Sequence, residues 1–259
     1  MKPSTLATID IGSNAVRLLI NNVETEADGY AFKKIAYLRV PIRLGEDVFT
    51  HARISMAKAG QLTEAVLGFG HIMRAYAVSG FRACATSAMR DAANGAELVR
   101  AIRKKAGIDI EIISGAQEAE LIYAAGAPQA ALAHVDVCLG VDVGGGSTEL
   151  VVYANEQVQF HDSFQIGTVR LLSQAVDEAE KARFVRCLKR IHEDYAPVSL
   201  VASGGNINKA SRMLGKKAND PLRFSELETL AANLKALSFD ERMRVFGLND
   251  YRADVIVPA

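Results

Sequence analysis

Apolar and polar positions alternate along this chain in an order that occurs twice. In the first half, an apolar run at 6–9 is followed by a polar, glycine-containing turn and by a second apolar run at 16–20. In the second half, runs at 137–141 and 150–153 stand on either side of a turn that is richer still in glycine. Short apolar runs bounded by such turns are typical of β-strands. The pattern therefore predicts one strand–turn–strand unit in each half.

The rest of the pattern predicts strands that alternate with helices. Helical spacing of apolar residues after Ser55 predicts a helix to about residue 78, and Gly107 is a typical end for a helix that starts at Asp91 or Asn94. We expect further strands at 30–40, 81–86, 108–113 and 198–202, three strands within 135–164, and further helices at 115–125, 168–176, 178–194, 206–214, 224–237 and 239–246. This alternation predicts an α/β fold with two domains, residues 1–125 and 126–259, joined near 124–133 by a linker or a helical crossover.

The two repeated turns carry residues that suit phosphate binding. The first reads Asp10-Ile-Gly-Ser-Asn-Ala, and the second reads Asp142-Val-Gly-Gly-Gly-Ser-Thr-Glu149. Glycine lets consecutive N–H groups approach an anion closely, and an aspartate oxygen is a ligand for a hard cation such as Mg²⁺. Ordinary hairpin turns also contain Asp and Gly, but two copies in the same setting favour a pair of phosphate clamps. The predicted phosphate-binding residues are Gly12, Ser13, Asn14, Gly144, Gly145, Gly146, Ser147 and Thr148.

A third candidate anion site follows the strand predicted at 198–202. Ser203, Gly204 and Gly205 stand between this strand and a predicted helix, where backbone N–H groups can meet an anion. A simple strand–helix turn with Asn206 as the N-cap would produce the same sequence. The residues alone leave both interpretations open.

Composition limits the kind of protein this can be. Among 259 residues, Lys and Arg number 30 and Asp and Glu number 30, so the formal net charge is zero. That balance argues against a protein that coats nucleic acid or a membrane surface. Cys84, Cys138 and Cys187 are isolated in the sequence, which argues against disulfides and structural zinc. No apolar run is long enough for a signal peptide or a membrane span, so the expected location is the cytoplasm.

Five strings in this chain resemble those of one enzyme family. They begin at Ile9, Arg43, Ala85, Ile113 and Val141 and read IDIGSNAVR, RLGE, ATSAMRDAAN, ISGAQEAELIY and VDVGGGSTEL. In this order they resemble the exopolyphosphatase / guanosine-pentaphosphate phosphohydrolase (Ppx/GppA) family of the actin / Hsp70 / sugar-kinase superfamily. The resemblance implies two duplicated ribonuclease H-like (actin-like ATPase) domains, each a mixed sheet flanked by helices, with a cleft between them.

The resemblance also implies a reaction and its cofactor. The reaction is hydrolysis of the terminal phosphoryl group of inorganic polyphosphate, or of the 5′ γ-phosphate of guanosine pentaphosphate, and the cofactor is Mg²⁺ or another divalent cation. Glu118 matches the catalytic glutamate that activates water, and Arg90 matches an active-site arginine. By their residue chemistry alone, Glu118 could instead be a first-turn carboxylate that favours the helix dipole, and Arg90 could form a surface salt bridge.

Four further residues take their expected roles from the same resemblance. Asp10, Asp142 and Glu149 match the acidic residues of the two clamps and are the candidate metal ligands. Arg17 ends the first clamp and is counted among the phosphate-binding residues. A turn-capping role for the aspartates and a solvent-facing strand position for Glu149 are the plainer alternatives.

The chain departs from the family pattern at three places. Ala15 stands where many members have serine, and Gln117 stands where many have a second glutamate. The chain stops at Pro258-Ala259, where relatives continue into further elements, so we expect the second domain to be C-terminally truncated. The truncation keeps a non-catalytic sensor of polyphosphate or guanosine tetraphosphate open as an alternative, beside an actin-fold kinase or ATPase. A homodimer is the one protein partner that we consider.

Overall fold

The computed structural model describes residues 4–26, 29–124, 137–155, 157–196, 199–217 and 220–259. The chain forms two compact units that divide between Ser114 and Gly115. The sequence placed this division after residue 125. Helix α5 (Gly115–Ala124) accounts for the difference, because its contacts are with strands β7 and β8 of the second unit. The linker predicted near 124–133 lies almost entirely outside the described residues.

The first unit is built on a five-stranded sheet with the order β3-β2-β1-β4-β5. Strand β1 pairs antiparallel with β2, β2 pairs antiparallel with β3, and β4 runs parallel to both β1 and β5. The bounds are β1 (Ser4–Ile11), β2 (Val16–Glu26), β3 (Gly29–Val40), β4 (Gly80–Ala85) and β5 (Glu111–Ile112). Strand β5 is shorter than the predicted 108–113, although Ile108 and Ile110 are buried in the core beside it.

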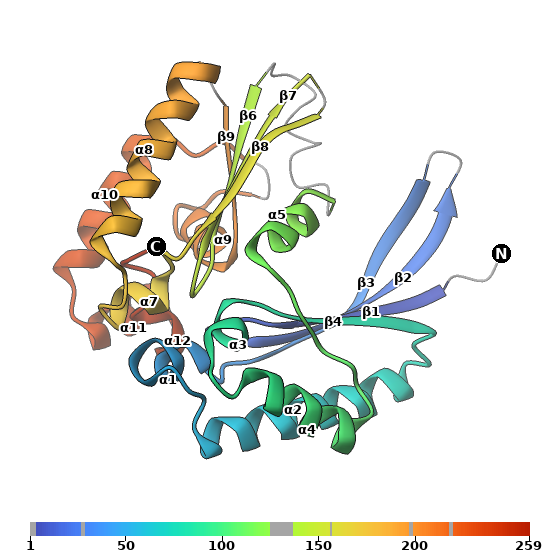
Figure 1. Cartoon of the computed structure of the whole chain (residues 1–259). Helices are drawn as coiled ribbons and strands as arrows, with labels where there is room; N and C mark the ends of the chain where they lie inside the picture. Colours follow the sequence, from blue (N-terminus) through green and yellow to red (C-terminus); the bar gives the residue numbers. More distant parts are fainter. Residues whose placement is uncertain (1–3, 27–28, 125–136, 156, 197–198, 218–219) are drawn as a thin grey trace. The chain divides into compact units, whose positions relative to one another are not determined.

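Helices α2 and α4 cover one face of this sheet, as Figure 1 shows. The helices of the unit are α1 (Leu44–His51), α2 (Met56–Ala75), α3 (Ser87–Asp91) and α4 (Gly95–Ala106). Ser55 caps α2 as predicted, since its side chain accepts a hydrogen bond from the N–H of Lys58. Leu62, Val66 and Phe69 of α2 are buried against the sheet. Each contributes on the order of 1.5–3 kcal/mol of hydrophobic stabilisation.

The sequence pattern missed the two short helices of this unit. Helix α1 begins after Arg43, which adopts a left-handed conformation (φ 58°), and α3 begins directly after β4. Neither helix is long enough to give a clear 3.6-residue period. Gly107 ends α4 in a left-handed conformation, as predicted. Asn94 stands at the N-cap of α4, but its side chain pairs with the backbone of Ile54 instead of capping the helix.

The second unit repeats the arrangement of strands on a four-stranded sheet with the order β8-β7-β6-β9. Strands β6, β7 and β8 pair antiparallel in turn, and β9 runs parallel to β6. The bounds are β6 (Val137–Val143), β7 (Thr148–Ala154), β8 (Gln157–Phe164) and β9 (Ser199–Ser203). The order matches that of β3, β2, β1 and β4. The predicted duplication of a mixed sheet flanked by helices is therefore confirmed.

Helices lie on both faces of the second sheet. Figure 1 shows α8 (Glu178–Tyr195) on one face and α5 on the other. Leu150 and Val152 of β7 face α8, whereas Val151 and Tyr153 pack with Ala119 of α5. This alternation is the usual consequence of the two-residue period of a strand.

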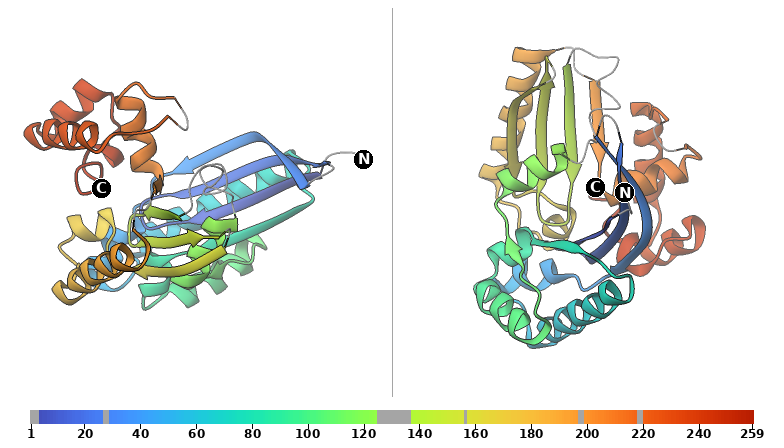
Figure 2. Two further views of the ribbon diagram at one scale, coloured as in Figure 1. Left: turned by 90° about the horizontal axis from the view of Figure 1, so that it is seen from above. Right: turned by 90° about the vertical axis from the view of Figure 1, so that its right-hand side faces the viewer.

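The remaining helices of the second unit are short or lie beyond β9. They are α7 (Thr168–Leu172), α9 (Gly205–Met213), α10 (Phe224–Ala236), α11 (Phe239–Phe246) and α12 (Asp250–Ala253). The last four, drawn in orange and red in Figure 2, surround a small apolar core of their own. The first residues of α9 and the last of the chain meet there, since Asn206 Nδ2 donates to the carbonyl of Val255 at 3.3 Å. No helix in the described part of the chain is long and apolar enough to cross a membrane.

Candidate active site

The turn between β1 and β2, residues 12–15, is called loop 1. The N–H of Gly12 donates to the carbonyl of Ala15 at 3.1 Å and closes the turn. The carbonyl of Ser13 accepts a hydrogen bond from the N–H of Gly45 in the first turn of α1, at 2.8 Å. Because the C=O and the next N–H of a trans peptide point in opposite directions, this contact leaves N–H groups on the other side of the loop. Loop 1 can offer those N–H groups to an anion.

Two serine side chains hold loop 1, and an asparagine side chain of the loop is buried beside them. The hydroxyls of Ser13 and Ser87 hydrogen-bond to each other at 2.8 Å, and both residues are buried. Ser87 opens α3 at the end of β4, the strand beside β1. In the described part of the chain, Asn14 Oδ1 is buried without a hydrogen-bond partner. Leaving such an acceptor unsatisfied costs about 1–3 kcal/mol, so a donor on a ligand or a water would be stabilised there.

A row of charged side chains crosses one face of the first sheet beside loop 1. Asp10 and Arg17 are direct cross-strand partners and form an ion pair. Arg39 on β3 is in turn the direct partner of Arg17. Directly paired residues of an antiparallel sheet point to the same face, so the row reads Arg39, Arg17, Asp10. Two guanidinium groups and one carboxylate make this row cationic.

The turn between β6 and β7, residues 144–147, is called loop 2 and has the same construction. The N–H of Gly144 donates to the carbonyl of Ser147 at 2.9 Å, as Gly12 does to Ala15 in loop 1. The carbonyl of Gly145 accepts from the N–H groups of Val169 (2.8 Å) and Arg170 (3.1 Å) in α7. Helix α7 therefore stands against loop 2 as α1 stands against loop 1.

Loop 2 is held more tightly than loop 1. Arg170 is buried, and its Nε donates to the carbonyl of Gly146 at 2.9 Å. A Cβ built on Gly167 would lie 2.5 Å from backbone atoms of Gly145 and Gly146. Only glycine fits at residue 167, because the backbone of loop 2 occupies the space of a side chain there. These contacts fix the glycines of loop 2 without using a side chain of the loop itself.

Two carboxylates lie next to each other on the strands that enter and leave loop 2. Asp142 on β6 and Glu149 on β7 are direct cross-strand partners, in the positions that Asp10 and Arg17 hold in the first unit. Glu149 is only 2 % exposed, and its Oε1 accepts a hydrogen bond from the hydroxyl of Ser163 at 3.0 Å. The solvent-facing alternative for Glu149 is therefore wrong. Two adjacent carboxylates favour a cation between them or beside them.

The turn from β9 into α9 lies on the other side of Asp142. Ser203 is the direct partner of Asp142 on the neighbouring parallel strand. Gly204 has a positive φ of 106°, which favours glycine, and a Cβ there would lie 2.6 Å from Asp142 Oδ1. Gly204 is the N-cap of α9, so the alternative with Asn206 as the cap is wrong. Asn206 lies within the helix and is buried, where it accepts a hydrogen bond from Arg252.

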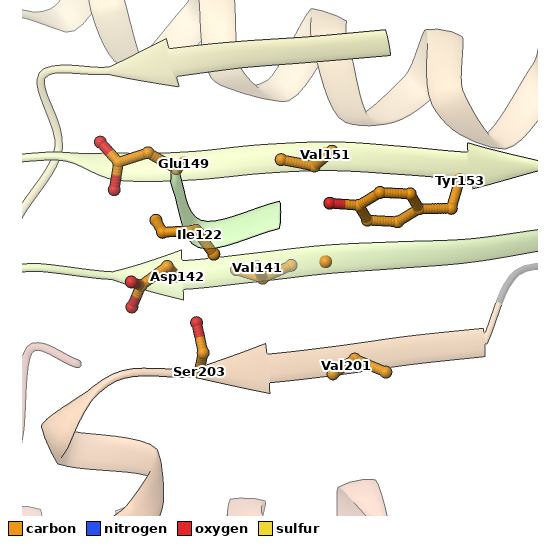
Figure 3. A pocket seen from close by; sticks show the side chains of 9 residues that line it. Ile122, Val141, Asp142, Glu149, Val151, Tyr153, Val201 and Ser203 are labelled. Carbon is orange, nitrogen blue, oxygen red and sulfur yellow. The ribbon is translucent and has the colours of Figure 1, made fainter. Parts of the chain in front are cut away.

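A pocket opens beside these residues on the face of the second sheet that carries α5. Its empty volume, including the part open to solvent, is about 290 Å³. Figure 3 shows Asp142, Glu149 and Ser203 at one end of it and Val201 and Tyr153 at the other. The polar end thus collects one side chain from each of β6, β7 and β9. Ile122 of α5 lies beside the two carboxylates, and side chains of the strands line the apolar end (Figure 3).

Glu118 lies in the first turn of α5, as predicted, and is half-buried. The next residue, Ala119, is 1 % exposed and packs on Val151 of β7. Gly115, the first residue of α5, touches β8 so closely that a Cβ there would lie 2.5 Å from the Cβ of Ser163. The same helix therefore lines the pocket with Ile122 and carries Glu118 within one unit.

Arg90 lies in the first unit at the end of α3. Its Nη1 donates to the carbonyl of Ile113 at 2.8 Å, and its Nε lies 4.0 Å from the carboxylate of Asp91. Ile113 follows β5 and its N–H donates to Ala85 at the end of β4. Arg90 is therefore fixed near the carboxyl ends of the parallel strands, the usual position of sites in α/β proteins.

Several residues of this arrangement were missed by sequence reasoning. Ser163 and Gly167 lie in or just after the predicted third strand of the second half, and Arg170 opens the predicted helix that follows. Ser163 could have been recognised as the polar residue opposite Glu149 on the neighbouring strand. Which residue stands at that position depends on the register of the hairpin, so the sequence does not identify it.

In the described part of the chain, no group of three or more His, Cys, Asp or Glu residues could hold a metal ion.

Comparison with known proteins agrees with this geometry. The model of the Ppx/GppA phosphatase family matches residues 22–259. Exopolyphosphatase 1 of Mycobacterium tuberculosis is 25% identical over 272 residues, which cover 97% of this chain and 78% of the relative. The guanosine-5'-triphosphate,3'-diphosphate pyrophosphatase of Aeromonas salmonicida is 26% identical over 262 residues, which cover 96% of this chain and 52% of that enzyme.

Solved structures are similar over nearly the whole chain. An exopolyphosphatase from Cytophaga hutchinsonii has a TM-score of 0.83 and 25% identity, covering 98% of this chain and 87% of that one. The Ppx/GppA family member of Aquifex aeolicus has a TM-score of 0.74 and 28% identity, covering 99% of this chain and 87% of that one. Sequence and fold thus lead to the same group of phosphohydrolases, and the chain belongs to the Ppx/GppA phosphatase family.

Proposed function

We propose that this chain removes the terminal phosphate from inorganic polyphosphate, or the 5′ γ-phosphate from guanosine pentaphosphate. The observation that carries the proposal is the pair of similar loops with different charges. Loop 1 is followed by Arg17, ion-paired with Asp10, and loop 2 is followed by Glu149, beside Asp142. A phosphate chain that is bound together with a divalent cation needs a cationic and an anionic contact of this kind.

The two carboxylates beside loop 2 suit a magnesium ion. Mg²⁺ is usually held by one or two carboxylates together with substrate phosphates and waters, and Asp142 and Glu149 are two carboxylates on adjacent strands. Asp10, the third candidate ligand, is ion-paired with Arg17, which favours a role in orienting that guanidinium. A divalent cation bound at Asp142 and Glu149 would neutralise charge on the phosphate oxygens.

Two arginines of the first unit and the backbone of the loops would hold the phosphate chain. The N–H groups of Ser13 and Asn14 and those of residues 145–148 are the proposed donors to phosphate oxygens. The N–H groups of Gly12 and Gly144, which the sequence also predicted to bind phosphate, instead close the two turns. The N–H groups of Ser203, Gly204 and Gly205 are proposed for a further phosphate of the chain. Arg17 and Arg90 add positive charge, and guanidinium groups match the geometry of phosphate oxygens.

Glu118 is the proposed group that acts on water. Its carboxylate would orient a water molecule and accept its proton while the water oxygen attacks the terminal phosphorus. The bond between that phosphorus and the bridging oxygen breaks, and the shortened chain leaves with the bonding electrons. Glu118 stands on α5, and Ile122 of the same helix lines the pocket that holds Asp142 and Glu149. This position supports the role of Glu118.

Phosphate release from the two substrates tests the proposal. With Mg²⁺ present, we expect the unmodified chain to release phosphate from medium-length polyphosphate, from guanosine pentaphosphate, or from both. Glu118→Gln should lower kcat by about 100-fold or more, because general-base catalysis commonly contributes 10²–10⁴-fold. Glu120→Gln is the matched control, since Glu120 lies exposed on the same helix, and its kcat should stay within about twofold.

Two results would contradict the proposal. A Glu118→Gln chain with normal turnover would show that another group acts on water. A folded, unmodified chain that binds polyphosphate but releases no phosphate would instead favour the sensor function.

A further inference from the structure

Glu149 is a buried carboxylate that accepts a hydrogen bond from a neighbour on the adjacent strand. The hydroxyl of Ser163 on β8 donates to Glu149 Oε1 at 3.0 Å, and the two residues are direct cross-strand partners. Glu149 is 2 % exposed. A buried carboxylate is strongly penalised unless donors or cations surround it, so this hydrogen bond restrains the carboxylate as well as stabilising it.

Ser163 is itself fixed from the side of α8. Arg183 of that helix donates to the carbonyl of Ser163 at 2.6 Å and forms an ion pair with Asp162 at 2.6 Å. Its guanidinium also lies 3.9 Å from the centre of the Phe164 ring. Arg183 further pairs with Glu180 and, mainly through its hydrogen bond, keeps the pKa of Glu180 below the ordinary value. Residues 162–164 are thus tied to α8 by one partly exposed cationic group, the guanidinium of Arg183.

The side of α5 restrains Ser163 in a second way. A Cβ built on Gly115 would lie 2.5 Å from the Cβ of Ser163 and 2.6 Å from its Oγ. Such closeness means that the Ser163 side chain lies directly against α5, in space that only a glycine at residue 115 leaves free. In that position its hydroxyl donates to Glu149.

We propose that Ser163 is a positioning residue: it sets the orientation of the Glu149 carboxylate and thereby the affinity of the Asp142–Glu149 pair for a divalent cation. This inference rests on the proposed function, because it assumes that this pair holds the cation. Groups that orient metal ligands typically contribute 10–100-fold to metal affinity. Ser163 then acts through Glu149, without touching the phosphate.

Binding of Mn²⁺ alone, without substrate, tests this directly. Free Mn²⁺ is measured by electron paramagnetic resonance during titration of the full chain. Ser163→Ala should weaken Mn²⁺ binding by about 10–100-fold, whereas Thr229→Ala should leave it unchanged. The control removes a hydroxyl that donates to the carbonyl of Ser225 in the exposed part of α10. Thermal unfolding followed by circular dichroism checks that each chain is folded.

A double-substitution cycle separates positioning through Glu149 from a general structural role. Glu149→Gln removes the carboxylate, so adding Ser163→Ala to that chain should weaken the remaining Mn²⁺ binding by less than about twofold. An equal loss in both backgrounds, or no loss from Ser163→Ala alone, would overturn the inference. If Ser163→Ala does not fold, Ser163→Cys takes its place in the cycle, since it keeps the shape of the side chain and has a weaker donor.

These outcomes are distinct from those of the proposed function. A chain that binds Mn²⁺ with the expected cycle but releases no phosphate would contradict the proposed reaction and support the role of Ser163. A chain that releases phosphate in the presence of Mg²⁺ with the same Mn²⁺ affinity before and after Ser163→Ala would do the reverse. An unmodified chain that binds no Mn²⁺ would overturn the assignment of the cation to this pair, and the inference with it.

Discussion

Loop 1 and loop 2 are closed in the same way, but the side chains that follow them, Arg17 and Glu149, have opposite charges. Each is closed by one hydrogen bond from its first glycine, and each is held by a short helix that follows the third strand of its sheet. The residue that pairs with the leading aspartate differs: it is Arg17 in the first unit and Glu149 in the second. The two loops thus share their closing hydrogen bond and differ in the charge of one neighbouring side chain.

The difference extends to the neighbouring strands. Arg39 stands beside Arg17, whereas the equivalent place beside Glu149 is occupied by Ser163. An arginine at that place adds positive charge that suits a phosphate, and a serine supplies a neutral donor to a carboxylate. We therefore expect the first unit to bind phosphate oxygens and the second to bind the cation.

Removing the charge of Arg17, on β2 beside loop 1, should weaken substrate binding most. For Arg17→Met we expect the KM for polyphosphate to rise by roughly 10–100-fold, because hydrogen bonds from a guanidinium to phosphate oxygens are among the strong ones. The concentration of Mg²⁺ that gives half of the maximal rate should change little. Steady-state kinetics at several Mg²⁺ concentrations measure both quantities.

Arg103→Met is the control for Arg17→Met, because Arg103 is an exposed arginine that pairs with Asp109 in the same unit. If Arg17→Met left KM unchanged but raised the Mg²⁺ requirement, the two loops would have the reverse of the roles that we assign.

A smaller effect is expected on stability, and it concerns how tightly loop 2 is packed. Gly167→Ala should lower the free energy of unfolding by about 1–3 kcal/mol, because its Cβ would overlap the backbone of loop 2. Gly68→Ala is the control: it lies within α2 with no atom within 4 Å of its Cβ, and alanine should stabilise a helix interior by up to about 1 kcal/mol. Urea unfolding measures both. Equal values for the two variants would show that loop 2 yields to a side chain at residue 167.

Much of the fold could be predicted from the sequence, because local residue patterns identify most of its helices and strands. Ser55 caps α2 and Gly107 ends α4 as their residue types indicate. Helices α1 and α3 could not be found in this way, because they are too short to show a period and depend on contacts with loop 1. Their positions follow from tertiary structure.

The site was predictable only in part, for a related reason. Asp142 and Glu149 stand in one string of the sequence, and the structure places them opposite each other across β6 and β7. Ser163 comes from a third strand, and its contact with Glu149 depends on a register that no local pattern fixes. Arg17 was expected to bind phosphate, but the sequence did not show that it pairs with Asp10.

We propose above all that residues beside loop 1 bind phosphate oxygens and that residues beside loop 2 bind the cation. The Mg²⁺ requirement of two matched variants tests this division most directly. Asp10→Asn and Asp142→Asn make the same chemical change at equivalent positions of the two loops. For phosphate release, we predict that Asp142→Asn raises the half-saturating concentration of Mg²⁺ by about tenfold or more, since it removes a ligand. Asp10→Asn should change it by less than about threefold, because its partner is Arg17. An Mg²⁺ requirement that rises as much in Asp10→Asn as in Asp142→Asn would contradict the division.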